Sequence, residues 1–397
     1  MVRLGAWMPF EPGSGMIDHF TKVTLSEPTV RRNTEASGKA YVEVQAAEVE
    51  RLKKEMPEPP EGPEVQQISV DGAMVPLVKG RWAEVRTLAI GTVKREVVGG
   101  GLEVRTEEIS YFSRMADHGS FGQQALVEIY RRGTEKAGTV CGVNDGAEWE
   151  QGFMDYHRPD AVRILDWGHS SEYIAKAGQA VYGLGTAETS EWVGEQLHEL
   201  KTGDPGKVLA ALRGLEKEVA VRVAEGRREE VLKVVSGSLE YLKKRREQIA
   251  YADFLSKGYP IGSGVVESAN KLVVESRLNG SGMHWADEQV NPMLALRNVV
   301  CSDRWDEAWE EISQKLRQQA RERKAALRAE RQKARVAEER AQEAVAAEPL
   351  REAPRVVIAA KAQTPPQADK EPATTGTGSQ RPGKDHPWRH MLIGKPR

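Results

Sequence analysis

The chain of 397 residues contains only two cysteines, Cys141 and Cys301. Two cysteines cannot build a disulfide framework, and no Cys/His cluster has the spacing of a zinc site. No apolar run approaches the roughly 20 residues that a membrane-spanning helix needs, and the first residues lack the pattern of a signal peptide. These absences argue against a disulfide-stapled scaffold, a zinc protein and a membrane partner, and they predict a cytoplasmic location.

An excess of charge of one sign is also missing from the chain as a whole. The 57 Lys and Arg residues nearly balance the 59 Asp and Glu residues, so the net charge is −2. Residues 315–340 depart from this balance, with ten Lys and Arg residues against four Glu. Such a stretch can lie along a polyanion or form an ordinary solvated helix, and both interpretations stay open.

Breaks in composition predict six segments. The N-terminal segment is helical, with one helix from Ser26 to a C-terminal glycine at Gly38 and a second helix ending near Met56. After residue 348 the chain is rich in Ala, Pro, Thr, Lys and Glu and is expected to be disordered. The expected segments are a helical region 1–60, a core 61–170, an all-helical insertion 171–258, the rest of the core 259–312, a basic helix 313–348 and a tail 349–397.

The core segments predict an α/β fold. Three stretches from Glu64 onward have period-two or apolar character, which is typical of strands joined in an antiparallel meander. A helix near 120–133 then precedes the strand signal of AGTVCGVND, and another helix precedes AVRILDW. Strands that alternate with helices after a meander predict a mixed sheet with helices on both faces.

Three carboxylates stand at comparable places in this pattern. Asp71 follows the first strand, Asp145 follows the strand after the first intervening helix, and Glu267 lies on a helix beyond the all-helical insertion. An Asp-Gly pair after an apolar run is also a common hairpin signal, so turns at Asp71 and Asp145 remain an alternative. In a ribonuclease-H-like sheet, however, the first and fourth strands are neighbours and their acids converge. Three hard oxygen donors suit two Mg²⁺ or Mn²⁺ ions and not zinc.

Several motifs extend this pattern to a known family. The segment YPIGSGVVESANKLVVESRLNGSGMHW, preceded by ISVDGAMVPL, VNDGAEW and ILDWGHSSEY, resembles the bacterial insertion-sequence transposases of the ISKra group. These enzymes resemble, more broadly, the Mutator-like DDE transposases. The similarity runs from about Thr24 to Asp306. It implies a ribonuclease-H-like fold, two bound Mg²⁺ or Mn²⁺ ions, and cleavage and strand transfer of DNA by a nucleoid-associated homo-oligomer that binds transposon ends and target.

The resemblance also assigns roles to the acids. The first catalytic Asp of the family matches Asp71, and the Glu of its Glu-Ser-x-Asn helix matches Glu267. The second Asp has two candidates. Asp166, with His169 three residues later, matches a secondary signature that lies about twenty residues beyond the second catalytic Asp. Asp145 lies 21 residues before Asp166 and is the better match, with Asp166 as the alternative.

His169 and four cations are further candidates. His169 is expected either to orient Asp166, to approach the scissile phosphate, or to be an ordinary structural histidine. The helix that carries Arg31 and Arg32 resembles the second half of a helix-turn-helix, which would face the major groove. Lys271 and Arg277 follow Glu267 on its helix and are candidates for phosphate contacts, although exposed helical cations usually meet only water.

Two alternatives to an active transposase stay open. Members of the group carry a longer N-terminal region, often with Cys pairs, so the chain could be a truncated or domesticated DNA-binding derivative without activity. Acids at all three positions weigh against that interpretation. The other alternative is a metal-dependent nuclease with the same fold. The long helical insertion favours a transposase over such a nuclease.

Overall fold

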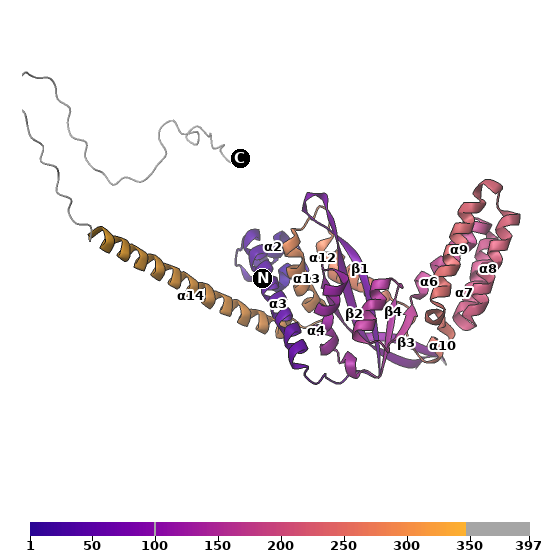
Figure 1. Cartoon of the computed structure of the whole chain (residues 1–397), viewed down its shortest axis with the longest axis horizontal. Helices are drawn as coiled ribbons and strands as arrows, with labels where there is room; N and C mark the ends of the chain where they lie inside the picture. Colours follow the sequence, from indigo (N-terminus) through magenta and orange to yellow (C-terminus); the bar gives the residue numbers. More distant parts are fainter. Residues whose placement is uncertain (99–100, 347–397) are drawn as a thin grey trace, which may run out of the picture. The chain divides into compact units, whose positions relative to one another are not determined.

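The computed structural model describes residues 1–98 and 101–346. Their α/β fold (Figure 1) is built on a five-stranded mixed sheet, and the strand order is β3-β2-β1-β4-β5. The predicted combination of a mixed sheet with many helices is confirmed. The strands are β1 (Val65–Pro76), β2 (Trp82–Val98), β3 (Gly101–Arg114), β4 (Thr139–Asn144) and β5 (Val162–Leu165).

The first strand does not end at Asp71, as the sequence analysis expects, but continues to Pro76. β1 and β2 pair antiparallel from Gln66 through Asp71, which lies opposite Thr87, to Pro76. The hairpin interpretation of Asp71-Gly72 is therefore wrong, and the chain reverses after Leu77 instead, at the short helix η1 (Val78–Gly80). The alternating residues Ala73 and Val75 are buried beyond the Asp-Gly pair, and their burial explains why the strand continues.

Each face of the sheet is covered by helices, because its strands have apolar residues on both sides. On one face, Ile68 and Val70 of β1 pack on α4 (His118–Arg131) and α5 (Glu148–His157). On the other face, Ala73 and Val75 pack on a second layer. Since side chains alternate along a strand, Asp71 faces this second layer. The layer consists of α11 (Gly264–Ala269), the π-helix η5 (Asn270–Glu275), α12 (Ser276–Leu278) and α13 (Asp287–Cys301).

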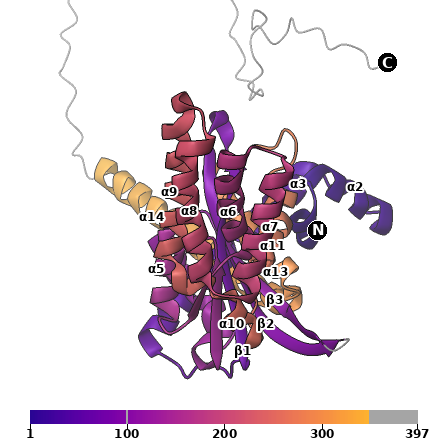
Figure 2. The ribbon, with the colours of Figure 1, turned by 90° about the vertical axis from the view of Figure 1, so that its right-hand side faces the viewer.

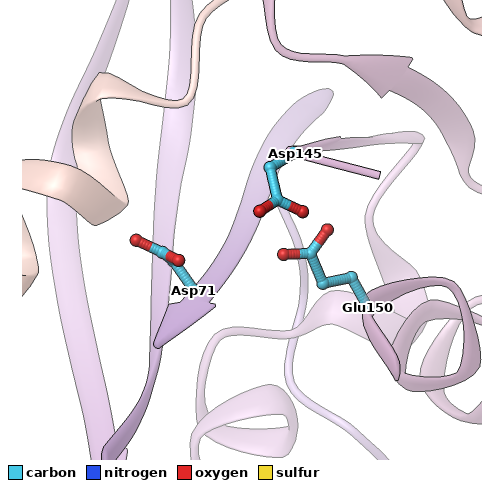
Figure 3. Close-up of side chains that lie close together, drawn as sticks. All are labelled: Asp71, Asp145 and Glu150. Atoms are coloured by element: carbon cyan, nitrogen blue, oxygen red, sulfur yellow. The ribbon is translucent and has the colours of Figure 1, made fainter. Parts of the chain in front are cut away.

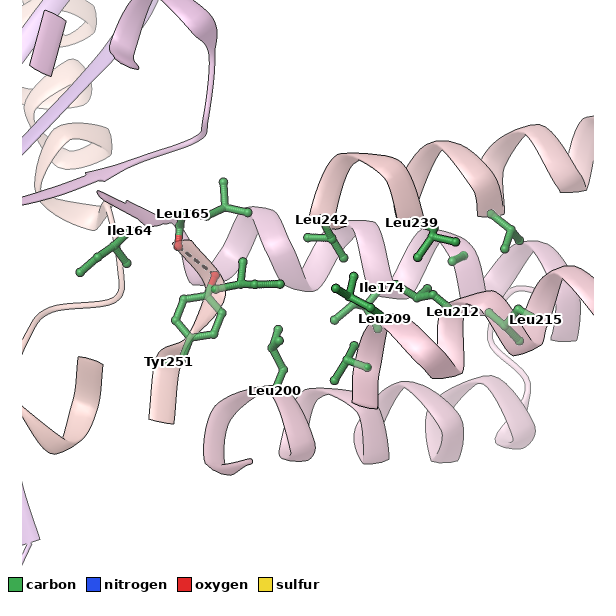
Figure 4. Close-up of a cluster of buried hydrophobic side chains, with 14 of the residues drawn as sticks. Ile164, Leu165, Ile174, Leu200, Leu209, Leu212, Leu215, Leu239, Leu242 and Tyr251 are labelled. Atoms are coloured by element: carbon green, nitrogen blue, oxygen red, sulfur yellow. Dashed lines mark hydrogen bonds between the residues drawn. The ribbon is translucent and has the colours of Figure 1, made fainter. Parts of the chain in front are cut away.

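Residues 166–258, all of which the structure describes, contain helices and turns but no strand. Figure 2 shows the main helices of this segment running side by side. Their leucines and isoleucines form one buried cluster with Ile164 and Leu165 of β5, and the Tyr251 hydroxyl donates a hydrogen bond of 2.9 Å to the Leu165 carbonyl (Figure 4). The insertion is thus anchored at the end of β5. Its helices are α6 (Trp167–Tyr182), α7 (Ala187–Thr202), α8 (Pro205–Arg222), α9 (Arg228–Lys244) and α10 (Tyr251–Ser256).

The N-terminal segment differs from its prediction at Gly38. Two short helices, α1 (Val2–Trp7) and α2 (Phe10–Thr21), precede one continuous helix α3 (Glu27–Glu55), where two helices separated by Gly38 were expected. Gly38 is buried inside α3, and a Cβ atom there would collide with the Pro292 carbonyl of α13. The glycine therefore permits close packing of two helices and does not end one.

The edge strand β3 is bound by side chains of α13 and the residue after it. The amide N–H groups of three alternate residues, Tyr111, Ser113 and Met115, donate to the side chains of Ser302, Asn298 and Asn291, at 3.1, 3.0 and 2.8 Å. These bonds satisfy backbone groups that a sheet edge would otherwise leave without partners.

The predicted basic helix begins earlier than residue 313. It belongs to α14 (Trp305–Ala346), whose first turns bury Trp305, Ala308 and Ile312 against α1, α3 and α13. Contacts divide the chain into two compact units, Met1–Glu330 and Arg331–Arg397, and α14 crosses this boundary. The predicted tail 349–397 lies outside the described residues. Among the helices that are described, none is both long enough and apolar enough to cross a membrane.

Candidate metal site beside β1 and β4

Asp71 and Asp145 come together because of the register between two parallel strands. The β1–β4 ladder places Val65 opposite Thr139 and Ile68 opposite Gly142, an offset of 74 residues that also separates Val70 from its hydrogen-bond partner Asn144. Asp71 and Asp145 are separated by the same offset, so the two carboxylates lie at one level of neighbouring strands. The sequence-based pairing of these two acids agrees with this geometry.

A third acid, Glu150 of α5, joins them. One carboxylate oxygen from each of Asp71, Asp145 and Glu150 lies within 4.8 Å of the other two, and Figure 3 shows the three side chains together. Glu150 is buried, and its carboxylate accepts hydrogen bonds from the amides of Gly146 and Ala147, at 2.9 and 3.0 Å. The loop between β4 and α5 therefore carries Asp145, and its amides are held by Glu150 from the first turn of α5.

The helical insertion holds this loop in place. The Tyr241 hydroxyl of α9 donates to the Asp145 carbonyl, and the Arg245 guanidinium donates to the Gly146 carbonyl at 2.6 Å. Gly146 has a φ of +90°, and a Cβ atom there would lie 2.5 Å from Nε of Arg245. Glycine is therefore required at 146 both by its backbone conformation and by the close approach of α9. In the described structure Asp145-Gly146 is not a hairpin turn. It begins the loop to α5, whose carbonyls accept hydrogen bonds from Tyr241 and Arg245.

Burial and mutual repulsion perturb the acids. Burial raises the pKa of Glu150 to about 10, and the neighbouring Asp145 carboxyl adds to this increase by a hydrogen bond and by its charge. Burial also raises the pKa of Asp71, as do the charges of Asp145 and Glu267, while hydrogen bonds from Gly72 and Asn270 lower it. A divalent cation would relieve this repulsion, because it favours the charged form of every carboxylate around it.

Glu267 lies close to this group without belonging to it. Within the described residues it is not part of the cluster of ligand atoms within 4.8 Å, and it is exposed on α11. Three residues later, Asn270 donates from Nδ2 to the second carboxylate oxygen of Asp71 at 2.8 Å. The Glu-Ser-x-Asn segment thus reaches the site through its asparagine, and the metal-binding role of Glu267 stays a prediction.

Asp166 has a different environment from Asp145. Its side chain is buried and caps α6, accepting a hydrogen bond of 2.9 Å from the His169 amide and one of 2.6 Å from the Ser263 amide. Both carboxylate oxygens are thus occupied by backbone donors. His169 meets Asp166 through its backbone, and its ring lies 6.3 Å from that of Tyr173. The geometry therefore favours Asp145 over Asp166 as a ligand.

The predicted DNA-contacting cations fall into two groups. Arg277 is only 1% exposed, with its guanidinium over the rings of Phe10 and Trp285 and a hydrogen bond of 3.1 Å to the Gly5 carbonyl. The prediction that Arg277 contacts phosphates at the surface is therefore wrong, because Gly5 and Phe10 of the N-terminal segment cover its side chain. The other three cations are exposed: Arg31 and Arg32 on α3 and Lys271 next to Asn270.

Sequence reasoning did not find Glu150, Tyr241 or Arg245. Glu150 stands five residues after Asp145 in the first turn of a helix, where an acid is a common cap, so its position alone carries little signal. Tyr241 lies in the last turn of α9 and Arg245 directly follows this helix, four residues later. Only the packing of α9 against the loop shows what they do.

The donor set fits a divalent cation that prefers oxygen. Asp71, Asp145 and Glu150 would hold such an ion, with no cysteine or histidine in the group. In comparisons with known proteins, no family model matches the chain and no curated protein matches it.

Proposed function

We propose that this protein is a DDE transposase that cleaves DNA at the ends of an insertion sequence and transfers the freed strand, and that its sheet is ribonuclease-H-like. The observation that carries the proposal is the placement of Asp71 and Asp145 at one level of adjacent parallel strands. The strand order β3-β2-β1-β4-β5 supports the fold, because such a sheet has its first and fourth strands side by side.

The contacts of the site support the same chemistry. Bound Mg²⁺ or Mn²⁺, as a pair of ions, would activate water or a 3′-hydroxyl and stabilise the leaving oxygen of a phosphodiester. Asp71, Asp145 and Glu150 would hold the ions, and Asn270 fixes the orientation of Asp71. Tyr241 and Arg245 fix the loop that carries Asp145. Besides burial, the charge of Glu267 raises the pKa of Asp71, and the charge of Asp145 raises the pKa of Glu150, so each glutamate lies near one acid of the pair.

Cleavage of a labelled duplex that contains the end of the element, by the full chain in Mg²⁺, tests this proposal. Asp145→Asn should abolish cleavage and leave DNA binding intact, because it removes a ligand needed in the transition state. Asp166→Asn should keep residual activity and mainly lower the melting temperature, because its side chain caps α6. Glu148→Gln, an exposed acid of the same loop and helix, should leave cleavage unchanged.

The products and the ranking of variants decide the outcome. Joined strand-transfer products distinguish a transposase from a nuclease that only cuts. Full activity in Asp145→Asn would exclude the proposed role of the acid pair. Wild-type protein that binds DNA and neither cleaves nor joins it would support a non-catalytic derivative.

A further inference from the structure

A basic hollow lies where the C-terminal end of α9 meets the start of β5. Five cations line this hollow of about 620 Å³, together with apolar residues that include Val162 and Phe254. None of the five was singled out as a DNA contact by the sequence. They are Lys243, Lys244, Arg245 and Arg246, which are consecutive, and Arg163 of β5.

The hollow has more positive than negative charge. Glu247 is the one acid among its lining residues, all of which the structure describes. Exposed acids outside the lining pair with three of the cations: Glu240 with Lys243 at 3.1 Å, Glu148 with Lys244 at 3.4 Å and Asp155 with Arg163 at 2.7 Å. Within the described residues, Arg245 and Arg246 form no salt bridge, and exposed pairs of this kind contribute little.

The helix dipole does not explain this arrangement by itself. Cations in the last turn of a helix interact favourably with its C-terminus, and this effect accounts for Lys243 and Lys244. It does not account for Arg246, which lies beyond the helix, or for Arg163, which comes from a strand. Cations from separate elements that surround one hollow are suited to an anion.

The hollow also adjoins the acid site. Arg245 lines it and donates to the carbonyl of Gly146, the residue after Asp145. Val162, at the hollow, pairs with Cys141, whereas Leu165 pairs with Asn144 beside the acids. Three residues along a strand span about 10 Å, and phosphates of one DNA strand are spaced about 3.4 Å apart along the helix axis. A strand cleaved at the acids therefore has further phosphates within reach of the hollow.

We propose that this hollow binds backbone phosphates of the DNA that flanks the scissile bond, with Lys243, Arg246 and Arg163 as the contacts. The inference rests on the proposed function, since it assumes that the acids act on DNA. It assigns the bound polyanion to nucleic acid and gives these cations a positioning role without base recognition.

Salt-dependent binding of a labelled duplex to the full chain, without divalent cations, tests the inference. The double variant Lys243→Gln/Arg246→Gln should flatten the plot of log affinity against log salt by about 0.9 for each lost contact, and so by about 1.8. Arg245 is left unchanged because it holds the Gly146 loop. Lys233→Gln is the matched control, since Lys233 is exposed on the same helix outside the hollow and should keep the wild-type slope.

Three results would overturn the inference, and they are distinguishable. A double variant with the wild-type slope and an unchanged melting temperature would show that the hollow does not bind phosphates. Polyglutamate that competes as well as unlabelled DNA would show a general polyanion surface instead. Wild-type protein that does not bind DNA would refute the proposed function, and this inference with it.

Discussion

His157, at the end of α5, is a histidine kept neutral by its surroundings. Its Nε2–H donates to the Gly122 carbonyl at 3.0 Å, and its ring lies 4.5 Å from that of Phe153 and 4.8 Å from that of Tyr156. Burial lowers its pKa from 6.5 to about 4. The folded protein therefore binds fewer protons at this residue than the unfolded chain between these two pH values.

This pKa shift predicts a pH dependence of stability. The contribution of His157 to the free energy of unfolding should be constant above about pH 6.5 and should fall as the pH decreases toward 4, by roughly 3 kcal/mol in total. His157→Gln, which keeps an N–H donor for Gly122, should show a smaller decrease. Urea unfolding at several pH values measures this decrease in the free energy of unfolding. His118→Gln, at an exposed histidine, is the control and should show the same decrease as the wild type. An equal loss of stability at acidic pH in the wild type and in His157→Gln would contradict this account.

Single residues show where sequence reasoning reaches its limit. Asp71 and Asp145 could be predicted as a pair because each follows an apolar run and a ribonuclease-H-like sheet has its first and fourth strands side by side, although β1 continues past Asp71. The burial of Arg277 could not, because Gly5 and Phe10, which cover it, are more than 260 residues away in the chain. Glu150 was missed for the opposite reason, since its local position already has an ordinary explanation as a helix cap.

At the scale of elements, the edge strand β3 depends on α13 for its hydrogen bonds. Asn298 is buried; its side chain accepts from the Ser113 amide and donates to the Ser113 carbonyl at 3.3 Å. The same helix contributes Asn291, which bonds Met115 in the same two-way manner. The helix thus takes the place of a sixth strand along this part of the sheet.

Removal of one such side chain should be costly. Asn298→Ala leaves the buried Ser113 amide without its partner, and we expect it to reduce the free energy of unfolding by about 1–3 kcal/mol. Gln289→Ala, on the same helix and only partly buried, should change it much less. Urea denaturation measures both variants. A loss no larger in Asn298→Ala than in Gln289→Ala would show that water replaces the asparagine.

The elements also show why the ends of helices and strands are harder to predict than whether a segment is a helix or a strand. The sheet and helices follow from hydrophobic periodicity, which is a local property. Gly38 has the composition of a helix end, yet it lies inside α3 because Pro292 of α13 packs against it. The charge pattern predicts that the basic helix begins at residue 313, whereas Trp305 and Ala308 of α14 already pack in the core. Both errors arise from contacts between distant segments.

At the scale of the whole molecule, α14 combines a packed start with an exposed continuation. Its residues from Arg331 to Arg340 are almost all exposed, while Trp305 and Ile312 are buried. Deleting 331–397 should therefore leave the melting temperature of the rest unchanged, and deleting 305–397 should lower it. The shorter deletion should also weaken DNA binding and flatten its salt dependence, because Arg331, Lys333, Arg335 and Arg340 are lost.

Thermal melting and DNA titration of the two truncated proteins check this prediction. An unchanged salt dependence after deletion of 331–397 would show that the exposed part of α14 is an ordinary solvated helix. A large loss of stability after the same deletion would contradict the division of the chain at Glu330.

The fixed offset between β1 and β4 limits how the length of this chain can change during evolution. Residues can be gained or lost at Val78–Gly80, where the chain reverses, without moving either acid. One residue gained or lost within 65–71 or within 139–145 would shift an acid to the opposite face of the sheet. Related chains that keep this pair of acids should therefore vary in length outside these two seven-residue stretches and never within them.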